Sequence, residues 1–187
     1  SLHQTAKDLH GLSRILEVST KSQNSLGVKL SAFNLKMTLN GRGVYSIESI
    51  YQGSKKFSHG GPFTDLYSAS SMDAKKDSRL KSSGNFEHYL FEGEKWDRDP
   101  ARAFYNWIYI TALKEMNEKS NILENLSDFD GFSDIEFNPK KSINCQAHAL
   151  AFYLHLIESS CLEEALNDKK IFCEKIIESD PNYQHTF

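Results

Sequence analysis

The sequence predicts one mainly helical α+β domain with a small antiparallel sheet. A chain of 187 residues has the length of a single domain and is long enough to bury a substantial core. Apolar residues recur at three- and four-residue steps in several segments, which predicts amphipathic helices. An Asn40-Gly41 pair between two short apolar stretches predicts a β-hairpin.

The N-terminal residues are expected to form a helix and a linker ahead of the main domain. Leucines spaced by three and four residues predict an amphipathic helix over residues 5–19. The stretch that follows, as far as Gly27, is polar and rich in turn-forming residues, which is typical of a linker. The expected division is an N-terminal helix and linker (1–27), the domain (28–180) and a C-terminal tail (181–187).

A hairpin and a helix are predicted next. Alternating apolar residues over 28–39 predict one strand with a bulge or two short strands, and the chain returns in a strand over 42–45. Residues 45–57 have the pattern of the first turns of a helix, which the break at 59–62 separates from the following elements. Two further short helices are expected over 63–69 and 71–78.

The second half of the chain is predicted to be mostly helical. Residues 87–96 alternate like an edge strand that ends in a turn. Asp99 and Pro100 suit an N-cap and a first helical position, and the helix to about residue 118 is apolar on most sides, as central helices are. The remaining elements are a loop with a short extended piece (129–137), a helix capped by Asn144 that begins at Cys145, and a final helix (161–178).

Composition excludes several classes of protein. The formal net charge of -3 argues against binding nucleic acid mainly through a broad basic surface. Three cysteines without C-x-x-C spacing argue against a disulfide framework or a zinc site. No apolar run reaches the roughly 20 residues of a membrane span, and no signal peptide is visible. We therefore expect a cytoplasmic monomer, bacterial or phage-encoded, with no metal, cofactor or membrane partner.

The segment from Tyr45 to Phe57 carries an acid, an amide and a base at short spacing. Glu48, Gln52 and Lys55 fall at i, i+4 and i+7, so a helix would place all three on one face. Such a face could position a sugar hydroxyl, a phosphate and a water together. The alternative is an ordinary surface ladder of charged and polar residues, which is common on helices.

A series of short segments resembles the NADAR family, in this order: Leu30-Ser31-Ala32-Phe33, Gly41, Val44 to Glu48, Tyr51-Gln52, and Lys55-Lys56-Phe57. The likeness continues in residues 70–77 and in Trp96, and it covers roughly residues 28–150. Ala32 stands where members have Asn, and residues 132–142 replace a late Trp-Gly segment. This variant pattern resembles the branch associated with DarT-type DNA ADP-ribosyltransferase toxins.

The resemblance implies an N-glycosidase that removes ADP-ribose from a nucleobase, with guanine in DNA as the expected base, and so opposes a DarT-like toxin. Two alternatives stay open. One is hydrolysis of a free N-ribosylated metabolite, as in members that act on riboflavin-pathway intermediates. The other is a module that binds ADP-ribose or the toxin without catalysis.

The implied chemistry assigns roles to the acid, amide and base. Cleavage of a ribosyl N-glycosidic bond passes through an oxocarbenium-like transition state. Glu48 would stabilise this cation or activate the incoming water. Gln52 would orient the sugar. Lys55 would bind phosphate, polarise the anomeric centre, or trap a ring-opened ribose as a Schiff base. The alternative for Lys55 is an ion pair with Glu48 or another acid.

Further residues are candidates for the walls of the site. Asp134 and Glu136 alternate with apolar residues, so both would share one face of an extended segment. That face would complete the active site opposite Glu48, with Asp134 as a further catalytic residue, or the two acids would pair with Lys140 or Lys141. Of the adjacent Lys75 and Lys76, one would face the ligand. Trp96 is a candidate platform for stacking a base, against the alternative of a core residue. The expected substrate-binding set is Ser31, Phe33, Tyr51, Lys75, Lys76, Trp96, Glu136, Asn138 and Lys140.

Overall fold

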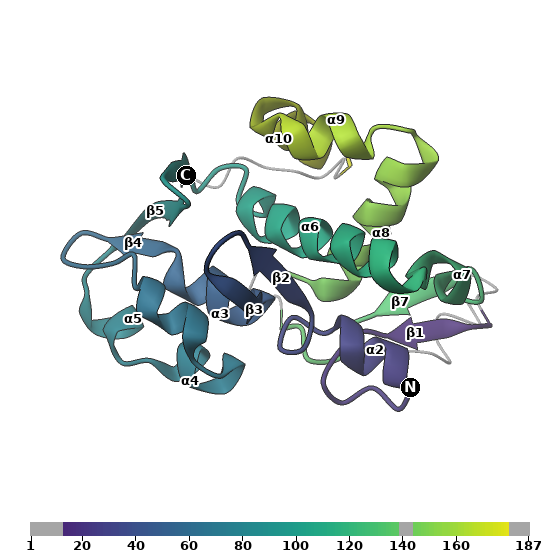
Figure 1. The fold of residues 1–187 in the computed structure, drawn as a ribbon, viewed down its shortest axis with the longest axis horizontal. Coiled ribbons are helices and arrows are strands. Elements are labelled where there is room, and N and C mark those ends of the chain that lie inside the picture. Colours follow the sequence, from purple (N-terminus) through teal and green to yellow (C-terminus); the bar gives the residue numbers. More distant parts are fainter. Residues whose placement is uncertain (1–12, 139–143, 180–187) are drawn as a thin grey trace.

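The structure, a computed structural model, describes residues 13–138 and 144–179 (Figure 1). The helices are α2 (Ser25–Leu30), α3 (Ile47–Gly53), η1 (Thr64–Ser68, a 3-10 helix), α4 (Ser71–Lys76), α5 (Arg79–Ser82), α6 (Ala103–Ser120), α7 (Ile122–Leu126), α8 (Gln146–Glu158), α9 (Leu162–Asn167) and α10 (Lys169–Glu178). The strands are β1 (Ile15–Glu17), β2 (Lys36–Leu39), β3 (Gly43–Ser46), β4 (Lys55–Phe57), β5 (Phe86–Phe91), β6 (Glu94–Trp96) and β7 (Gly131–Ser133). This content confirms the predicted α+β class.

The strands form three small sheets. β2 and β3 make the predicted antiparallel hairpin, in which Lys36 faces Ser46 and Leu39 faces Gly43. β4, β5 and β6 make an antiparallel sheet with β5 in the centre, so the prediction of an edge strand was wrong for β5. β1 and β7 pair in parallel, with Ile15 opposite Gly131. This last pairing joins segments more than 100 residues apart in the sequence, which no local pattern could indicate.

Helix α6 lies at the centre of the molecule and contacts β2, α3, α8 and α10 (Figure 1). Ile108, Ile110 and Leu113 on this helix are fully buried, which confirms the predicted central helix. The helix begins at Ala103, however, and not at Pro100. The peptide N–H of Ala103 bonds the carbonyl of Pro100 in a turn that precedes the helix.

The N-terminal prediction was wrong where the structure describes it. Residues 15–17 are strand β1, because pairing with β7 and complete burial of Leu16 and Val18 outweigh the helical spacing of the leucines. Residues 5–12 lie outside the described part of the chain. The expected linker contains the start of α2, which Asn24 caps by accepting a hydrogen bond from the peptide N–H of Leu26. Residues 28–30 are therefore helix and not strand.

Two C-terminal helix boundaries also differ from the prediction. Helix α8 begins at Gln146, and the Asn144 side chain donates a hydrogen bond to the Tyr51 hydroxyl and does not cap the helix. The expected final helix is divided into α9 and α10. Asp168 lies at the division in an extended conformation, and its carboxylate accepts hydrogen bonds from the peptide N–H groups of Lys170 and Ile171. An aspartate that caps a new helix in this way ends the previous one.

A buried tyrosine connects the central helix to the N-terminal part of the fold. The Tyr109 hydroxyl on α6 donates a 2.6 Å hydrogen bond to the carbonyl of Leu30 at the end of α2. Both residues are fully buried. This contact holds the turn after α2, which carries Ala32 and Phe33, against the core.

We expect Tyr109→Phe to lower the free energy of unfolding by about 1–2 kcal/mol, because it leaves the buried Leu30 carbonyl without its donor. Urea unfolding followed by circular dichroism measures the change. Tyr153→Phe is the matched control, because Tyr153 is also buried in the core but none of the described hydrogen bonds uses its hydroxyl. Equal effects of the two substitutions would contradict the role given to the Tyr109 bond.

Candidate functional site

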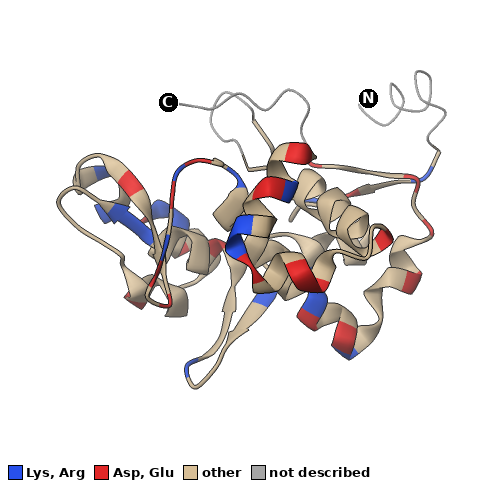
Figure 2. Cartoon of the chain, turned by 90° about the horizontal axis from the view of Figure 1, so that it is seen from above, with Lys and Arg blue, Asp and Glu red and all other residues tan. Residues whose placement is uncertain are grey.

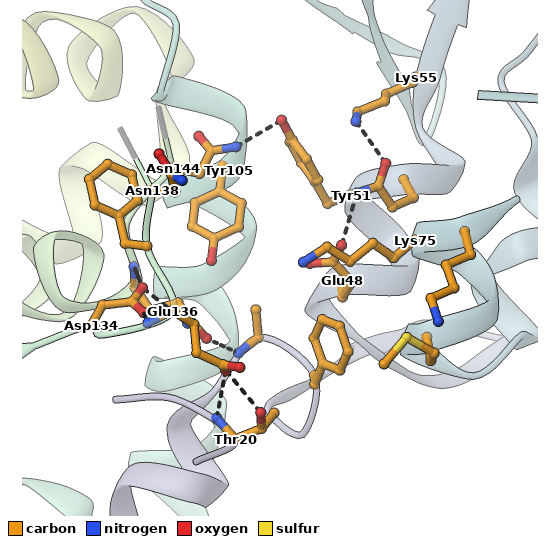
Figure 3. Close-up of a pocket in the computed structure, with 17 residues that line it drawn as sticks. Thr20, Glu48, Tyr51, Lys55, Lys75, Tyr105, Asp134, Glu136, Asn138 and Asn144 are labelled. Carbon is orange, nitrogen blue, oxygen red and sulfur yellow. Dashed lines mark hydrogen bonds between the residues drawn. The ribbon is translucent and has the colours of Figure 1, made fainter. Parts of the chain in front are cut away.

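One large pocket, with a volume of about 930 Å³, lies between α3 and α4 on one side and the segment after β7 on the other (Figure 3). Residues distant in the sequence meet there. The lining residues are Thr20, Ala32, Phe33, Glu48, Tyr51, Gln52, Lys55, Met72, Lys75, Lys76, Tyr105, Asp134, Glu136, Phe137, Asn138, Asn144 and Gln146.

Helix α3 supplies the acid and the amide. Ser46 caps the helix by accepting a hydrogen bond from the peptide N–H of Ser49. Ile47 and Ile50 are completely buried and fix the helix on the core, whereas Glu48 and Gln52, one turn apart, line the pocket. The Gln52 amide nitrogen donates a 2.8 Å hydrogen bond to the Glu48 carboxylate.

Lys55 joins this pair from a different element. Helix α3 ends at Gly53, which packs so closely that an added Cβ would lie 2.7 Å from the Tyr67 ring, and Lys55 begins strand β4. The prediction that one helix carries all three groups was therefore wrong for Lys55. Its ammonium still reaches the site and donates a 2.7 Å hydrogen bond to the Gln52 amide oxygen (Figure 3). Gln52 thus bridges the base and the acid.

The surroundings of Lys55 change its acidity. Burial lowers the pKa of this lysine to about 8, the Glu48 carboxylate raises it in part, and the nearby Lys75 ammonium lowers it further. The ammonium also lies 4.6 Å from the centre of the Tyr51 ring. A lysine with this pKa has a substantial neutral fraction near neutral pH and can act as a nucleophile or base.

Tyr51 is held rigidly beside the acid. Its hydroxyl shares a 2.9 Å hydrogen bond with the Tyr89 hydroxyl and accepts a 2.8 Å bond from the Asn144 amide. The Tyr105 ring packs edge-on against its ring, with 5.4 Å between the centres. Burial raises the pKa of Tyr51, which keeps it neutral. Tyr51 therefore offers a fixed aromatic surface and a polar group to a ligand.

The opposite wall is built around Asp134. Its carboxylate accepts hydrogen bonds from the backbone N–H and the side-chain amide of Gln146, at 3.0 and 3.1 Å. The Gln146 amide oxygen in turn accepts a 2.6 Å bond from the peptide N–H of Ala32. Both oxygens of Asp134 are occupied, because the other one accepts from the peptide N–H of Glu136. These hydrogen bonds hold the Asp134 carboxylate in place, which fits a residue that shapes the pocket wall.

Glu136 faces the pocket from a turn, so the prediction of an extended segment was wrong at these positions. Its carboxylate accepts bonds from the backbone N–H and hydroxyl of Thr20, at 3.2 and 2.9 Å, and pairs with Lys21 at 3.6 Å. The alternative partners Lys140 and Lys141 lie outside the described residues. Sequence reasoning missed Thr20, because nothing local indicates that residue 20 meets residue 136.

A buried carboxylate supports the same wall from behind. Glu17 is only 8% exposed, and it accepts hydrogen bonds from the Ser133 hydroxyl at 2.5 Å and the peptide N–H of Ile135 at 2.9 Å. Because Ile135 lies between Asp134 and Glu136, these bonds fix the turn that presents both acids. Sequence reasoning also missed Glu17, for which the local signal was its place between the apolar residues Leu16 and Val18.

The adjacent lysines of α4 both line the pocket, and Lys75 reaches toward Glu48 (Figure 3). Its ammonium lies 5.1 Å from the centre of the Phe33 ring, so Phe33 directs the lysine inward. Lys75 is therefore the residue of the pair that faces the acid. Asn138 also lines the pocket, and Lys140 lies outside the described part of the chain.

Two expected substrate-binding residues do not line the pocket. Ser31 is 1% exposed, and its hydroxyl donates to the carbonyl of Val28 and accepts from Asn34, so it stabilises the turn after α2. Trp96 is 2% exposed, and its ring packs against Phe104 and Trp107 in the core. Its large apolar ring is more favourable buried than at a pocket edge, so the alternative of a core residue holds for Trp96.

Among the described residues, no cluster of histidine, cysteine or acidic side chains has the arrangement of a metal site. Within the same residues, no helix combines the length and the apolar character that crossing a membrane requires.

We expect Lys55 to titrate near pH 8. Lys75→Gln removes a neighbouring positive charge and raises the pKa of Lys55, whereas Glu48→Gln removes a negative charge and lowers it. NMR of ¹³C-dimethylated lysines, with Lys55→Arg to assign the signal, measures the three midpoints. A Lys55 midpoint equal to that of exposed lysines, near 10.5, would contradict the effect of burial on its pKa.

Comparison with known families identifies the family of the chain. A family model described as "DarT1-associated NADAR antitoxin" matches residues 1–186. No curated protein matches the chain. The matched range includes the Glu48 helix, Lys55, the lysines of α4 and the wall after β7, and it confirms both the expected family and the expected branch. The chain belongs to the DarT1-associated NADAR antitoxin family.

Proposed function

We propose that this protein is an N-glycosidase that removes ADP-ribose from guanine in DNA and thereby counteracts a DarT-like toxin. The observation that carries the proposal is the hydrogen-bonded series Glu48–Gln52–Lys55 inside a pocket of about 930 Å³. This volume is in the range of pockets that enclose large cofactor-sized ligands. The family membership supports the link to the toxin.

In the direct route, water attacks the anomeric carbon of the ribose while its bond to the base nitrogen breaks. Glu48 is the carboxylate that stabilises the cationic sugar and takes the proton of the attacking water. One of its oxygens is occupied by Gln52, which fixes the direction of the other. The base nitrogen leaves with a proton, and free ADP-ribose and the unmodified base are the products.

Lys55 supports a second route. When the sugar is attached through an amino nitrogen, its ring can open to an imine. The neutral amine of Lys55 can exchange with the base at that carbon, which releases the base as an amine and leaves a Schiff base on the lysine. Water then hydrolyses the Schiff base to ADP-ribose. The lowered pKa of Lys55 favours this route, because only the unprotonated amine is nucleophilic.

The phosphates of ADP-ribose require cations. Lys75 extends into the pocket, and Lys76 lines it at the end of α4. The Phe33 and Tyr51 rings offer apolar faces beside them. We therefore assign the diphosphate to the α4 side of the pocket and the ribose to the space between Glu48 and Lys55.

Glu48→Gln tests the proposal directly. We expect wild type to release ADP-ribose from a guanine-modified oligonucleotide in the presence of EDTA, and the variant to be slower by about 100-fold or more. Mass spectrometry of the oligonucleotide follows the adduct. Glu124→Gln, on the exposed surface of α7, is the matched control and should retain full activity.

Absence of release by wild type would contradict the glycosidase on guanine. The same proteins would then be incubated with free N-ribosylated metabolites and titrated with ADP-ribose. A non-catalytic binder would keep its affinity for ADP-ribose in the Glu48→Gln variant and turn over none of these substrates.

The Schiff-base route makes a separate prediction. Sodium cyanoborohydride added during turnover should attach an ADP-ribose adduct irreversibly to Lys55, and peptide mass spectrometry should locate it there. Lys55→Arg should give no adduct, whereas Lys81→Arg should give as much as wild type. Turnover by wild type without any trapped adduct would support the direct route.

A further inference from the structure

Tyr105 presents a rigidly held ring in the interior of the pocket. It lies at the start of the central helix α6 and lines the pocket between the Glu48 side and the Asp134 side (Figure 3). The residue is only 5% exposed. Its ring packs on the Tyr109 ring with 5.9 Å between the centres, and edge-on against the Tyr51 ring at 5.4 Å. These contacts restrict the ring, so the direction of its hydroxyl is fixed.

The Tyr105 hydroxyl points into the pocket and has no hydrogen-bond partner among the described residues (Figure 3). The hydroxyls of its neighbours are occupied. Those of Tyr51 and Tyr89 bond each other, and that of Tyr109 bonds the carbonyl of Leu30. A largely buried polar group without a partner costs free energy in the folded protein. A fixed polar group of this kind inside a cavity is typical of a residue that binds a ligand.

Tyr105 keeps its proton in this position. Burial raises its pKa well above the usual value, and the Tyr109 hydroxyl and the carboxylates of Glu48 and Asp134 raise it further. A neutral phenol can donate one hydrogen bond and accept others, whereas a carboxylate such as that of Glu48 only accepts. A ligand group between the two is therefore best matched when it accepts from Tyr105 and donates to Glu48.

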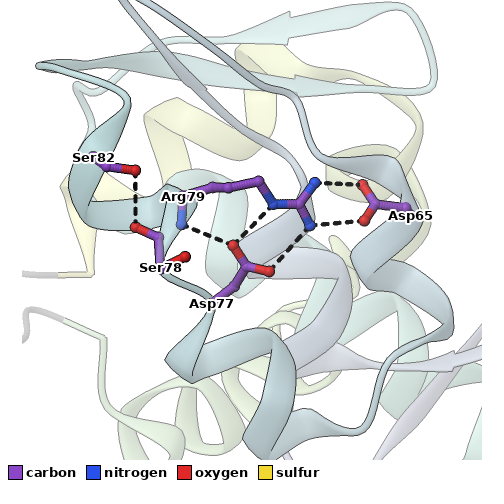
Figure 4. A network of polar contacts seen from close by, with 5 residues as sticks. All are labelled: Asp65, Asp77, Ser78, Arg79 and Ser82. Atoms are coloured by element: carbon purple, nitrogen blue, oxygen red, sulfur yellow. Dashed lines mark hydrogen bonds and ion pairs between the residues drawn. The ribbon is translucent and has the colours of Figure 1, made fainter.

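Cations are gathered on one side of the pocket. Figure 2 shows blue segments around β4, α4 and α5 at one end of the molecule. On α4, Lys75 and Lys76 line the pocket. Arg79 on α5 does not line it, and binds Asp65 at 2.7 Å and Asp77 at 2.9 Å (Figure 4). Within α4 and α5, the two lysines are therefore the cations that can contact the phosphates of a bound ligand.

The surroundings of Tyr105 are acidic instead. Glu48 and Asp134 are both close enough to raise its pKa, and Glu136 lines the pocket on the Asp134 side. Carboxylates repel phosphates and accept hydrogen bonds from hydroxyls. A carbonyl could accept from Tyr105 but could not donate to Glu48. A hydroxyl does both, so the part of a ligand that lies here is a sugar hydroxyl.

We propose that Tyr105 binds the 2-hydroxyl of the terminal ribose of ADP-ribose, the sugar attached to the base, and makes the site selective for ribose over 2-deoxyribose. This inference rests on the proposed function, which places the anomeric carbon of that ribose beside Glu48. The next carbon of the ring carries the 2-hydroxyl, which therefore lies in the same part of the pocket. The Tyr105 hydroxyl donates to it, and it donates to the Glu48 carboxylate.

This selectivity has a consequence for a modified base in DNA. Such a base carries two N-glycosidic bonds, one to the ribose of the adduct and one to the 2-deoxyribose of the strand. Only the first sugar has a hydroxyl for Tyr105. With the second sugar the Tyr105 hydroxyl stays unpaired, and a site built to bond a substrate hydroxyl rejects the sugar that lacks it. Tyr105 thereby directs cleavage to the adduct and spares the bond that holds the base in the strand.

Isothermal titration calorimetry of ADP-ribose and of its analogue without the 2-hydroxyl of the terminal ribose measures the contact. We expect wild type to bind the analogue about 100-fold more weakly, because two hydrogen bonds worth about 10-fold each are lost. Tyr105→Phe keeps the ring and should bind ADP-ribose about 10-fold more weakly than wild type. It should bind the analogue as wild type does, which also shows that the variant is folded.

Matched controls exist in the protein and in the ligand. Tyr153→Phe removes the hydroxyl of a buried tyrosine outside the pocket lining and should leave both affinities unchanged. An ADP-ribose analogue without the 2-hydroxyl of the adenosine ribose should respond to Tyr105→Phe as ADP-ribose does. An equal loss of affinity for ADP-ribose and for the terminal-ribose analogue in Tyr105→Phe would overturn the inference. So would a Tyr105 effect that disappears with the adenosine hydroxyl.

Turnover separates this inference from the proposed function. On the guanine-modified oligonucleotide, Tyr105→Phe should lower kcat/KM by about 10-fold, and Tyr153→Phe should not change it. If wild type releases no ADP-ribose but binding shows the expected contrast, the function fails and the assignment of Tyr105 stands. If wild type releases ADP-ribose and the contrast is absent, the function stands and the assignment is wrong. Wild type that binds neither ligand would overturn the assignment whatever the turnover.

Discussion

The site depends on keeping a buried acid, a buried amide and a half-buried base together in one pocket. Burying a carboxylate or an ammonium alone is costly, and the cost falls when each is hydrogen-bonded. Gln52 meets this need, because its amide donates to Glu48 and accepts from Lys55. A direct ion pair between the Glu48 carboxylate and the Lys55 ammonium would occupy both groups. The interposed amide satisfies them and leaves each accessible to a ligand.

The scaffold makes that arrangement rigid from two directions. Ile47 and Ile50 lock α3 on the core, and the hydrogen bonds of Tyr51 with Tyr89 and Asn144 connect the helix to strand β5 and to the segment just before α8. The other wall is held by the parallel pairing of β1 with β7. The N-terminal segment is therefore part of the site's support, since the wall turn is bonded to Glu17 and Thr20.

The cations inside the pocket and just outside it have different partners. Lys75 lies within it and lowers the pKa of Lys55, whereas Arg79 is held by Asp65 and Asp77 just outside. One arginine that binds two acids removes competing partners from the surrounding lysines. Of the two cations, it is Lys75 that lies close enough to lower the pKa of the Lys55 amine.

The sequence by itself determined the elements whose signals are local. The hairpin at Asn40-Gly41, the one-turn spacing of Glu48 and Gln52, and the central apolar helix α6 all follow from short-range patterns. The order of motifs was also sufficient to identify the family. Only the tertiary structure decided the strand at 15–17, the position of Lys55 on β4, and the burial of Trp96. These features depend on partners far away in the chain, whose pairing and burial outweigh the modest local preferences of the residues involved.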